Sequence, residues 1–316
     1  MSHLKLTVVA PVFNEEQVIK HFHARTRGVL SAMAGVDAKL LFVVDRCTDN
    51  TLNVLRDVVA GDPKSSVIVL SSRFGHQMAL LAGIENSLDA DVVIMMDSDL
   101  QHPPELIPEL IATFKRGFDV VYTVRRDTED VSFLRKTMGN LFYHILGKLS
   151  QVPISANSAD FRLISNRVAK LLASGFPERN MFLRGLFSWI GFSQTGVEYV
   201  AEKRFAGQSK YSFARMVQLG MAGTLSFSTK PLQIALFFGA SLAALAFIFL
   251  VGAVVSYFID KTIPSGWTTL VVFLLFFSGI QLIVLGIIGA YIGGIYEEVK
   301  GRPRYIIEEE ILHHER

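Results

Sequence analysis

Two long runs without a charged residue, near the C-terminal end of the chain, constrain the fold more than any other feature. The first covers residues 231–259 and the second covers residues 262–296, with one Asp-Lys pair between them. A helix of about 20 apolar residues crosses a bilayer, so each run is long enough to do so. The alternative is a pair of buried core helices, which runs of this length disfavour. We therefore expect transmembrane helices over 231–259 and 265–296, joined as a hairpin.

Basic residues around these runs predict their orientation. They gather before the first run and after the second, whereas the link holds a single lysine; the flanking ones are Lys203, Arg204, Lys210, Arg215, Lys230, Lys300, Arg302 and Arg304. Lys and Arg accumulate on the cytoplasmic side of membrane helices. Both termini are thus predicted to be cytoplasmic. The first apolar segment, LKLTVVAPVF, meets two glutamates at once and is not expected to be a signal peptide.

The composition of the whole chain excludes several classes of protein. Half of the residues are apolar and 19% are charged, with a net charge of +2. Disordered chains are poorer in apolar and aromatic residues, and nucleic-acid binders are more basic, so neither class is expected. Cys47 is the only cysteine, which excludes a disulfide scaffold and suits the cytosol. Small residues in the second run predict close helix packing and a homo-oligomer: Gly286, Gly289, Gly293 and Gly294.

Residues 1 to about 200 alternate short apolar runs with helical patterns. The predicted strands are LTVVAPVF, KLLFVVD, SSVIVLS, DVVIMMD and FDVVYTV, and the predicted helices cover 16–33, 49–59, 76–87 and 104–116. This alternation is typical of an α/β fold with a parallel or mixed sheet. Ligands of such sheets bind at the carboxyl ends of the strands.

The residues that follow the predicted strands are the candidate site. Asp97 and Asp99, with Ser98 between them and Gln101 after them, follow a very apolar strand, and carboxylates in such a turn can share one Mg²⁺ or Mn²⁺ ion. The alternative is a solvated turn that caps the next helix. Asp45 follows a neighbouring strand, where it would accept from a nucleobase or cap a helix. Neither a G-x-G-x-x-G nor a P-loop motif is present, which disfavours dinucleotide enzymes and P-loop NTPases.

The ordered motifs resemble those of the family 2 glycosyltransferases with a GT-A fold. They are VVAPVFNEE, VVD followed by TDNT, MMDSDLQHPPELIPELI, DFRLISNRV, FPERNMFLRGLFSWIGF, RFAGQSKYSF and the tail KGRPRYIIEE. Together with the hairpin, they resemble the polyprenyl-phosphate glycosyltransferases, most of all the bactoprenol glucosyltransferase type. The resemblance runs nearly end to end. It departs from the family where Arg46 and Cys47 stand in place of the usual Gly-Ser.

The resemblance implies a role for each matching residue. The predicted nucleotide-sugar ligands are Pro11, Phe13, Asn14, Glu15, Asp45, Asp97 and Ser98, with Asp45 facing the uracil. The predicted metal ligands are Asp97, Asp99 and Gln101. Asp160 matches the catalytic carboxylate, with Arg162 as an alternative structural partner. The predicted phosphate and lipid-phosphate ligands are Arg125, Arg135, Arg204, Ser209 and Lys210, and the two arginines 125 and 135 are alternatively surface charges.

The resulting hypothesis is an inverting, metal-dependent glycosyltransferase of the bacterial cytoplasmic membrane. It would move a sugar, most simply glucose from UDP-glucose, to undecaprenyl phosphate at the cytoplasmic face, for modification of cell-envelope glycans. The alternatives are another sugar (N-acetylhexosamine, mannose or aminoarabinose) or a non-catalytic scaffold or flippase. The expected organisation is a GT-A domain (1–208), an amphipathic juxtamembrane segment (209–230) that lies on the membrane surface, the two spans, and a cytoplasmic tail (297–316).

Overall fold

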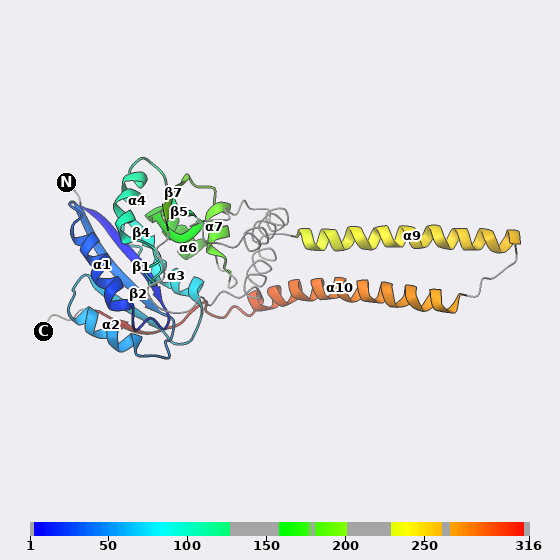
Figure 1. Cartoon of the computed structure of the whole chain (residues 1–316), viewed down its shortest axis with the longest axis horizontal. Coiled ribbons are helices and arrows are strands. Elements are labelled where there is room, and N and C mark those ends of the chain that lie inside the picture. The colour runs from blue at the N-terminus through cyan, green and yellow to red at the C-terminus, as the bar shows by residue number, and fades with distance from the viewer. Residues whose placement is uncertain are drawn as a thin grey trace.

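A mixed β-sheet forms the centre of the α/β unit in the computed structural model, which describes residues 3–126, 158–176, 178, 181–200, 229–260 and 266–312 (Figure 1). In this part of the chain the sheet has eight strands in the order β7-β5-β6-β4-β1-β2-β3-β8. The strands are β1 (Leu4–Val12), β2 (Val36–Val44), β3 (Ser65–Leu70), β4 (Val92–Met95), β5 (Val120–Arg126), β6 (Ser158–Ser165), β7 (Gln194–Val200) and β8 (Ile307–Ile311). The predicted α/β class is confirmed, and the sheet is mixed.

Strand direction divides the sheet into a parallel centre and antiparallel additions. β1 pairs in parallel with both β2 and β4, and β2 pairs in parallel with β3. β6 is antiparallel to β4 and to β5, and β8 is antiparallel to β3. The carboxyl ends of β1, β2 and β4 therefore share one edge, which is where the candidate residues follow.

Helices cover both faces of the sheet. They are α1 (Ile19–Ser31), α2 (Thr51–Ala60), α3 (His76–Glu85), η1 (Pro104–Leu106), α4 (Ile107–Phe114), α6 (Asn166–Gly175) and α7 (Leu183–Trp189). Alternate residues of β1 point to opposite sides, so that Val8 and Ala10 join a core with α1, α2 and α4, while Val9 joins a core with α3, α6 and α7. The four helices predicted from the sequence are present, although α1 begins three residues later than expected.

Helix α3 packs very close to the sheet, and Gly83 is the reason. A Cβ atom at this position would lie 2.1 Å from Val9 Cγ1 and 3.2 Å from Val43 Cγ2. No real Cβ makes a contact of 2.1 Å, so the absence of a side chain permits this approach. The close packing fixes the position of His76, the first residue of α3.

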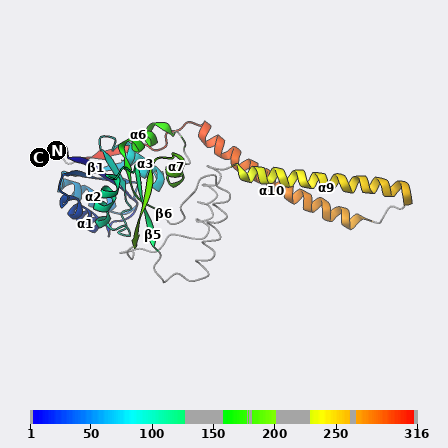
Figure 2. The ribbon, with the colours of Figure 1, turned by 90° about the horizontal axis from the view of Figure 1, so that it is seen from above.

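The two apolar runs form long helices that project away from the α/β unit in both views (Figures 1 and 2). α9 covers Lys230–Asp260 and α10 covers Trp267–Val299. Both contain windows long and apolar enough to cross a membrane, Leu232–Phe249 and Phe276–Val299, and neither window is buried inside the protein. Buried core helices are thus not what these runs form. Their orientation, and the close packing through the glycines, stay predictions.

The segment between α10 and β8, residues 300–306, returns the chain to the α/β unit; we call this segment the strap. The sequence analysis does not predict this return. The Ser71 N–H donates to the Ile306 carbonyl at 2.9 Å, and β8 then continues along β3. Within the expected cytoplasmic tail, β8 therefore forms part of the sheet. The predicted juxtamembrane segment 209–230 lies outside the described residues except for its last two.

Candidate active site

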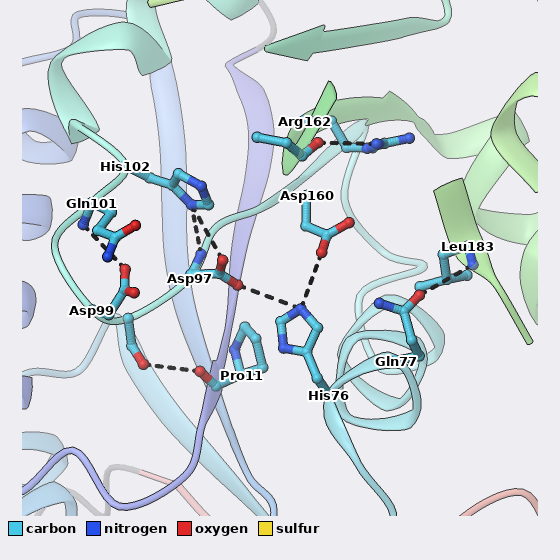
Figure 3. A network of polar contacts seen from close by, with 12 residues as sticks. Pro11, His76, Gln77, Asp97, Asp99, Gln101, His102, Asp160, Arg162 and Leu183 are labelled. Atoms are coloured by element: carbon cyan, nitrogen blue, oxygen red, sulfur yellow. Dashed lines mark hydrogen bonds and ion pairs between the residues drawn. The ribbon is translucent and has the colours of Figure 1, made fainter. Parts of the chain in front are cut away.

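The turn after β4 brings the Asp97–Asp99 cluster to the edge of the sheet (Figure 3). The Ser98 hydroxyl donates to the Pro11 carbonyl at 2.9 Å, which ties this turn to the end of β1. The Gln101 N–H donates to Asp99 Oδ1 at 3.1 Å. Leu100 adopts a φ of +63°, a left-handed conformation that L side chains rarely take. The strained turn holds the two carboxylates beside the residues predicted to bind a nucleotide.

His102 accepts a hydrogen bond from the backbone of Asp97. Its Nδ1 accepts the Asp97 N–H at 3.1 Å, so in the neutral ring the proton is on Nε2. The ring is buried and stacks on Phe161, with the two centroids 5.3 Å apart. Oδ1 of Asp97 is buried and accepts no hydrogen bond within the described residues. Oδ1 therefore has hydrogen-bonding capacity left over, which a ligand or metal ion bound at the site would satisfy.

His76 lies between the two acidic groups of the site (Figure 3). Its Nε2 is 3.5 Å from Asp97 Oδ1 and 3.4 Å from Asp160 Oδ2. Partial desolvation disfavours the charged ring, 40% of which is exposed, but Asp97 and Asp160 outweigh it and raise the pKa of His76 to about 9. His76 is therefore a cation at neutral pH in this arrangement. The sequence pattern alone left the role of His76 open.

Asp160, on β6, is held by a bidentate pair with Arg184. The Arg184 Nε lies 2.7 Å from Asp160 Oδ1, and its Nη2 lies 2.8 Å from Oδ2. Burial alone would raise the pKa of Asp160, but Arg184 and His76 hold it well below the ordinary value. The carboxylate is thus ionised, and two cations engage its oxygens. Such a group orients its neighbours better than it accepts a proton, because a low pKa makes a weak base.

Arg162 has a different partner from the one considered in the sequence analysis. Its guanidinium donates to the Ala159 carbonyl at 3.0 Å and lies over the Phe187 ring, 4.5 Å from the centroid. It is almost completely buried, which lowers its pKa to about 10. Arg184 therefore makes the close ion pair with Asp160 that the alternative had given to Arg162.

The predicted nucleotide-binding residues lie at the carboxyl ends of β1 and β2. Asn14 has a φ of +55°; its side-chain amide donates to the Thr48 hydroxyl at 2.9 Å and accepts the Thr48 backbone N–H at 2.8 Å. The Asn14 backbone N–H donates to Cys47 Sγ at 3.2 Å. The Glu15 N–H donates to the Thr51 hydroxyl at 2.9 Å. The Phe13 ring stacks under Arg73, 4.1 Å from the guanidinium carbon. These contacts join the two loops into one wall of the site.

Asp45 organises the loop before α3. Its two carboxylate oxygens accept the N–H groups of Phe74 at 2.7 Å and of Gly75 at 2.9 Å. The side chain therefore shapes the backbone that leads into His76, and its contact with a uracil stays a prediction. Arg46, at the position where the family usually has glycine, has a φ of +34° and donates to the Ser71 carbonyl. It also lies 4.0 Å from Glu308 of β8.

The predicted phosphate ligands are described only in part. Arg125 lies near the end of β5, where it is paired in register with Tyr199 of β7. Burial raises the pKa of Tyr199 to about 12; Arg125 opposes this rise, and Asp97 and Asp99 add to it. Tyr199 is therefore the described residue that both Arg125 and the acidic cluster influence. Arg135, Arg204, Ser209 and Lys210 lie outside the described residues.

The residues present fit a divalent cation that is shared with a substrate. Within the described part of the chain, no group of three or more His, Cys, Asp and Glu side chains is placed to hold a metal ion. Mg²⁺ is, however, commonly bound by one or two carboxylates together with substrate phosphates. Asp97, whose buried Oδ1 faces His76 but accepts no hydrogen bond within the described residues, and Asp99 supply such carboxylates. Gln101 stays a predicted third ligand.

Sequence reasoning assigned no role to Arg184 or Tyr199. Arg184 belongs to the quoted segment ERNMFLRG, but it is 24 residues from Asp160, and no local pattern links the two. Only the placement of α7 beside β6 brings them together. The presence of an arginine in an otherwise apolar helix, LRGLFSW, is the one local signal that could have singled it out.

Comparison with known proteins supports the resemblance seen in the sequence. The model of glycosyl transferase family 2 matches residues 7–172. An uncharacterized glycosyltransferase of Bacillus subtilis (strain 168) is 39% identical over 97% of this chain and 94% of its own length. The bactoprenol glucosyl transferase of Shigella phage SfV is 35% identical over 97% of this chain and 99% of its own.

Among solved structures, the glucosyl-3-phosphoglycerate synthase of Mycobacterium tuberculosis aligns with a TM-score of 0.44 and 16% identity, covering 70% of this chain and 78% of that one. The assignment depends instead on the family model and on relatives that match over almost the whole length, hairpin included. The chain belongs to glycosyl transferase family 2, and its α/β unit has the GT-A fold.

Proposed function

We propose that the protein transfers a hexose from a nucleotide sugar to undecaprenyl phosphate at the cytoplasmic face of the bacterial membrane. The favoured donor is UDP-glucose, and the favoured transferred sugar is glucose. The observation that carries the proposal is the full-length match to proteins named bactoprenol glucosyl transferase, which includes both the site and the two apolar helices. Bactoprenol is a polyprenol, a lipid that resides in the membrane. An enzyme bound to the membrane can therefore reach it.

The proposed reaction is a single displacement at the anomeric carbon of the sugar. An oxygen of the lipid phosphate forms the new bond to this carbon, the bond to the donor's diphosphate breaks, and the nucleoside diphosphate leaves with the electron pair. The anomeric configuration inverts. The second pKa of a phosphate monoester is about 6, so the attacking oxygen is already ionised near neutral pH and no base has to remove a proton.

The residues of the site match the charges of this reaction. The diphosphate gains negative charge as it leaves, and a Mg²⁺ or Mn²⁺ ion held by Asp97, Asp99 and Gln101 would stabilise that charge. His76 adds positive charge between Asp97 and Asp160. Asp160 keeps Arg184 and His76 in place through its two oxygens. We therefore assign Asp160 an orienting role, in agreement with its low pKa.

We propose that arginines and residues of the juxtamembrane segment bind the phosphate of the lipid acceptor. Arg125 is the described member of this group, and Arg135, Arg204, Ser209 and Lys210 are proposed by resemblance. Arginine suits the task because its planar guanidinium binds two phosphate oxygens at once. The lysine would act as a compact point charge near the membrane surface.

The test is a donor panel with purified full-length protein, undecaprenyl phosphate, Mg²⁺ or Mn²⁺, and labelled nucleotide sugars. Label that moves into the organic phase names the donor, and transfer from UDP-glucose is the expected result. Asp99→Ala should reduce transfer about 100-fold or more, because it removes a metal ligand. The matched control is Asp89→Ala, since Asp89 is an exposed carboxylate whose ion pair in the described part of the chain is with Lys39 at 3.0 Å. No transfer from any donor would overturn the proposal.

A further inference from the structure

Helix α7 ends in an unusually exposed tryptophan. Trp189 is 61% exposed, whereas Leu183, Leu186 and Phe187 on the same helix are almost completely buried. Its indole ring stands edge-on to Phe176, with ring centroids 5.8 Å apart and an angle of 81° between the planes. The ring is thus supported on one side by protein and open on the other.

The support of Trp189 lies beside the end of the membrane helix α10. Arg304, in the strap that follows α10, donates to the Phe176 carbonyl at 2.6 Å and pairs with Glu85 at 2.5 Å. Burial raises the pKa of Glu178, and Glu298 in the last turn of α10 raises it further by charge repulsion. α7 is on the side of the α/β unit that faces the hairpin in both views (Figures 1 and 2).

The charge pattern of α10 gives the height of this contact relative to a bilayer. The uncharged part of α10 runs from Trp267 to Tyr296, and 30 helical residues span about 45 Å. A bilayer with its headgroup layers is about 40–45 Å thick. Tyr296 and the adjoining Glu298 therefore come at the level of the headgroups. Because Phe176 accepts a hydrogen bond from Arg304, which follows α10 closely in the chain, and its ring contacts Trp189, we place Trp189 near the same level.

We propose that Trp189, supported by Phe176, inserts into the headgroup layer and anchors the catalytic unit at a fixed height above the membrane. Tryptophan is enriched at membrane interfaces because its ring is apolar while its N–H can donate to water or lipid. The inference rests on the membrane placement within the proposed function.

Arg184 and Trp189 occupy the same short helix, and five residues correspond to about 7.5 Å along its axis. The anchor and the Arg184–Asp160 pair therefore belong to one rigid element. A fixed height of α7 would keep the site within reach of a lipid phosphate, whose position is set by the same headgroup layer.

The chain has two tryptophans, Trp189 and Trp267, so Trp267→Phe leaves Trp189 as the only indole. This variant is reconstituted in phosphatidylcholine–phosphatidylglycerol vesicles that carry a nitroxide on the headgroup or deep in the acyl chain. We expect the headgroup nitroxide to quench about half of the fluorescence or more, with less quenching by the deep nitroxide and by iodide in the buffer. Trp189→Phe in the same background supplies the blank.

Two results would overturn the inference. Strong quenching by iodide with none from either nitroxide would place Trp189 in water. A blue-shifted emission that resists all three quenchers would mean that protein, such as a second copy of the chain, covers it. The fluorescence is independent of catalysis, so a protein that fails to transfer sugar still tests the anchor, and a failed anchor leaves the transfer assay intact.

Discussion

Strand β4 of the sheet and the central parts of α9 and α10 are all uncharged and apolar, yet they are covered in opposite ways. All four residues of β4 are buried, and helices of the same chain cover both of its faces. Within the described residues, the long apolar windows of α9 and α10 are not buried, and residues such as Phe237 are 74% exposed. Apolar content alone therefore does not decide where a segment goes. Length and the surrounding pattern decide whether protein or lipid provides the cover.

The largest expected effect is in the α/β unit, at the buried ion pair. Arg184→Ala leaves the Asp160 carboxylate, only 8% exposed, without its bidentate partner. Breaking a buried pair in this way costs about 3–5 kcal/mol. Thermal unfolding and transfer assays should both show the loss, while extraction from membranes still requires detergent. Arg184→Lys should recover part of the stability but little of the activity, because lysine cannot form the fork. Wild-type stability of Arg184→Ala would contradict the assigned pair.

A charge introduced into the hairpin should reduce membrane insertion and leave the stability of the α/β unit unchanged. Leu245 lies near the middle of α9 and is exposed. Leu245→Asp adds about 3 kcal/mol to the cost of placing this helix in a bilayer. We expect a smaller fraction of protein in carbonate-washed membranes, with the unfolding of the α/β unit unchanged. Leu245→Phe is the matched control. Equal membrane content for the Asp variant would contradict the membrane assignment of α9.

Gly83→Ala tests the close packing of α3 on the sheet. The added methyl group overlaps Val9, so we expect a loss of about 1–3 kcal/mol in the free energy of unfolding. Gly28→Ala is the control, because Gly28 lies within α1 and a Cβ there meets nothing within 4 Å. This control should be neutral or stabilising by up to about 1 kcal/mol. Equal stability of the two variants would show that α3 does not need the glycine.

The smallest effect concerns acid stability of the α/β unit. Hydrogen bonds from Arg167, Ser193 and Ser165 hold the pKa of Asp119 below its ordinary value. Because the folded-state pKa is lowered, the stabilisation is complete above the unfolded pKa, about 3.9, and is lost as the pH falls through the folded value. Arg167 is 63% exposed, so solvent screening keeps the contribution small. Asp119→Asn should therefore lose less stability than wild type between pH 5 and pH 3 in a thermal titration. An identical decline in both proteins would contradict this role.

The sequence predicted the parts of the fold that depend on local pattern. The strands ending near Asp45 and Asp97 and the helix at His76 were predictable from periodicity, and the hairpin was predictable from the absence of charge. β8 was not predicted, because its pairing with β3 joins residues more than 200 positions apart.

The same reason explains which site residues escaped prediction. Asp97 and Asp99 form a local motif that carries its own chemical meaning. Arg184, Tyr199 and the position of His76 between Asp97 and Asp160 depend on how α7, β7 and α3 are packed. Side chains that become partners only through tertiary packing leave no periodic signal in the sequence.

The most direct measurement is the initial rate of hexose transfer from UDP-glucose to undecaprenyl phosphate in proteoliposomes, for wild type and Asp99→Ala in parallel. With the wild-type protein, the predicted result is a lipid product heavier by one hexose. With the variant, the predicted rate is lower by about 100-fold or more. Equal rates for the two proteins would contradict the assignment of the Asp97–Asp99 cluster. The absence of a glycosylated lipid with every donor sugar would contradict the proposed reaction itself.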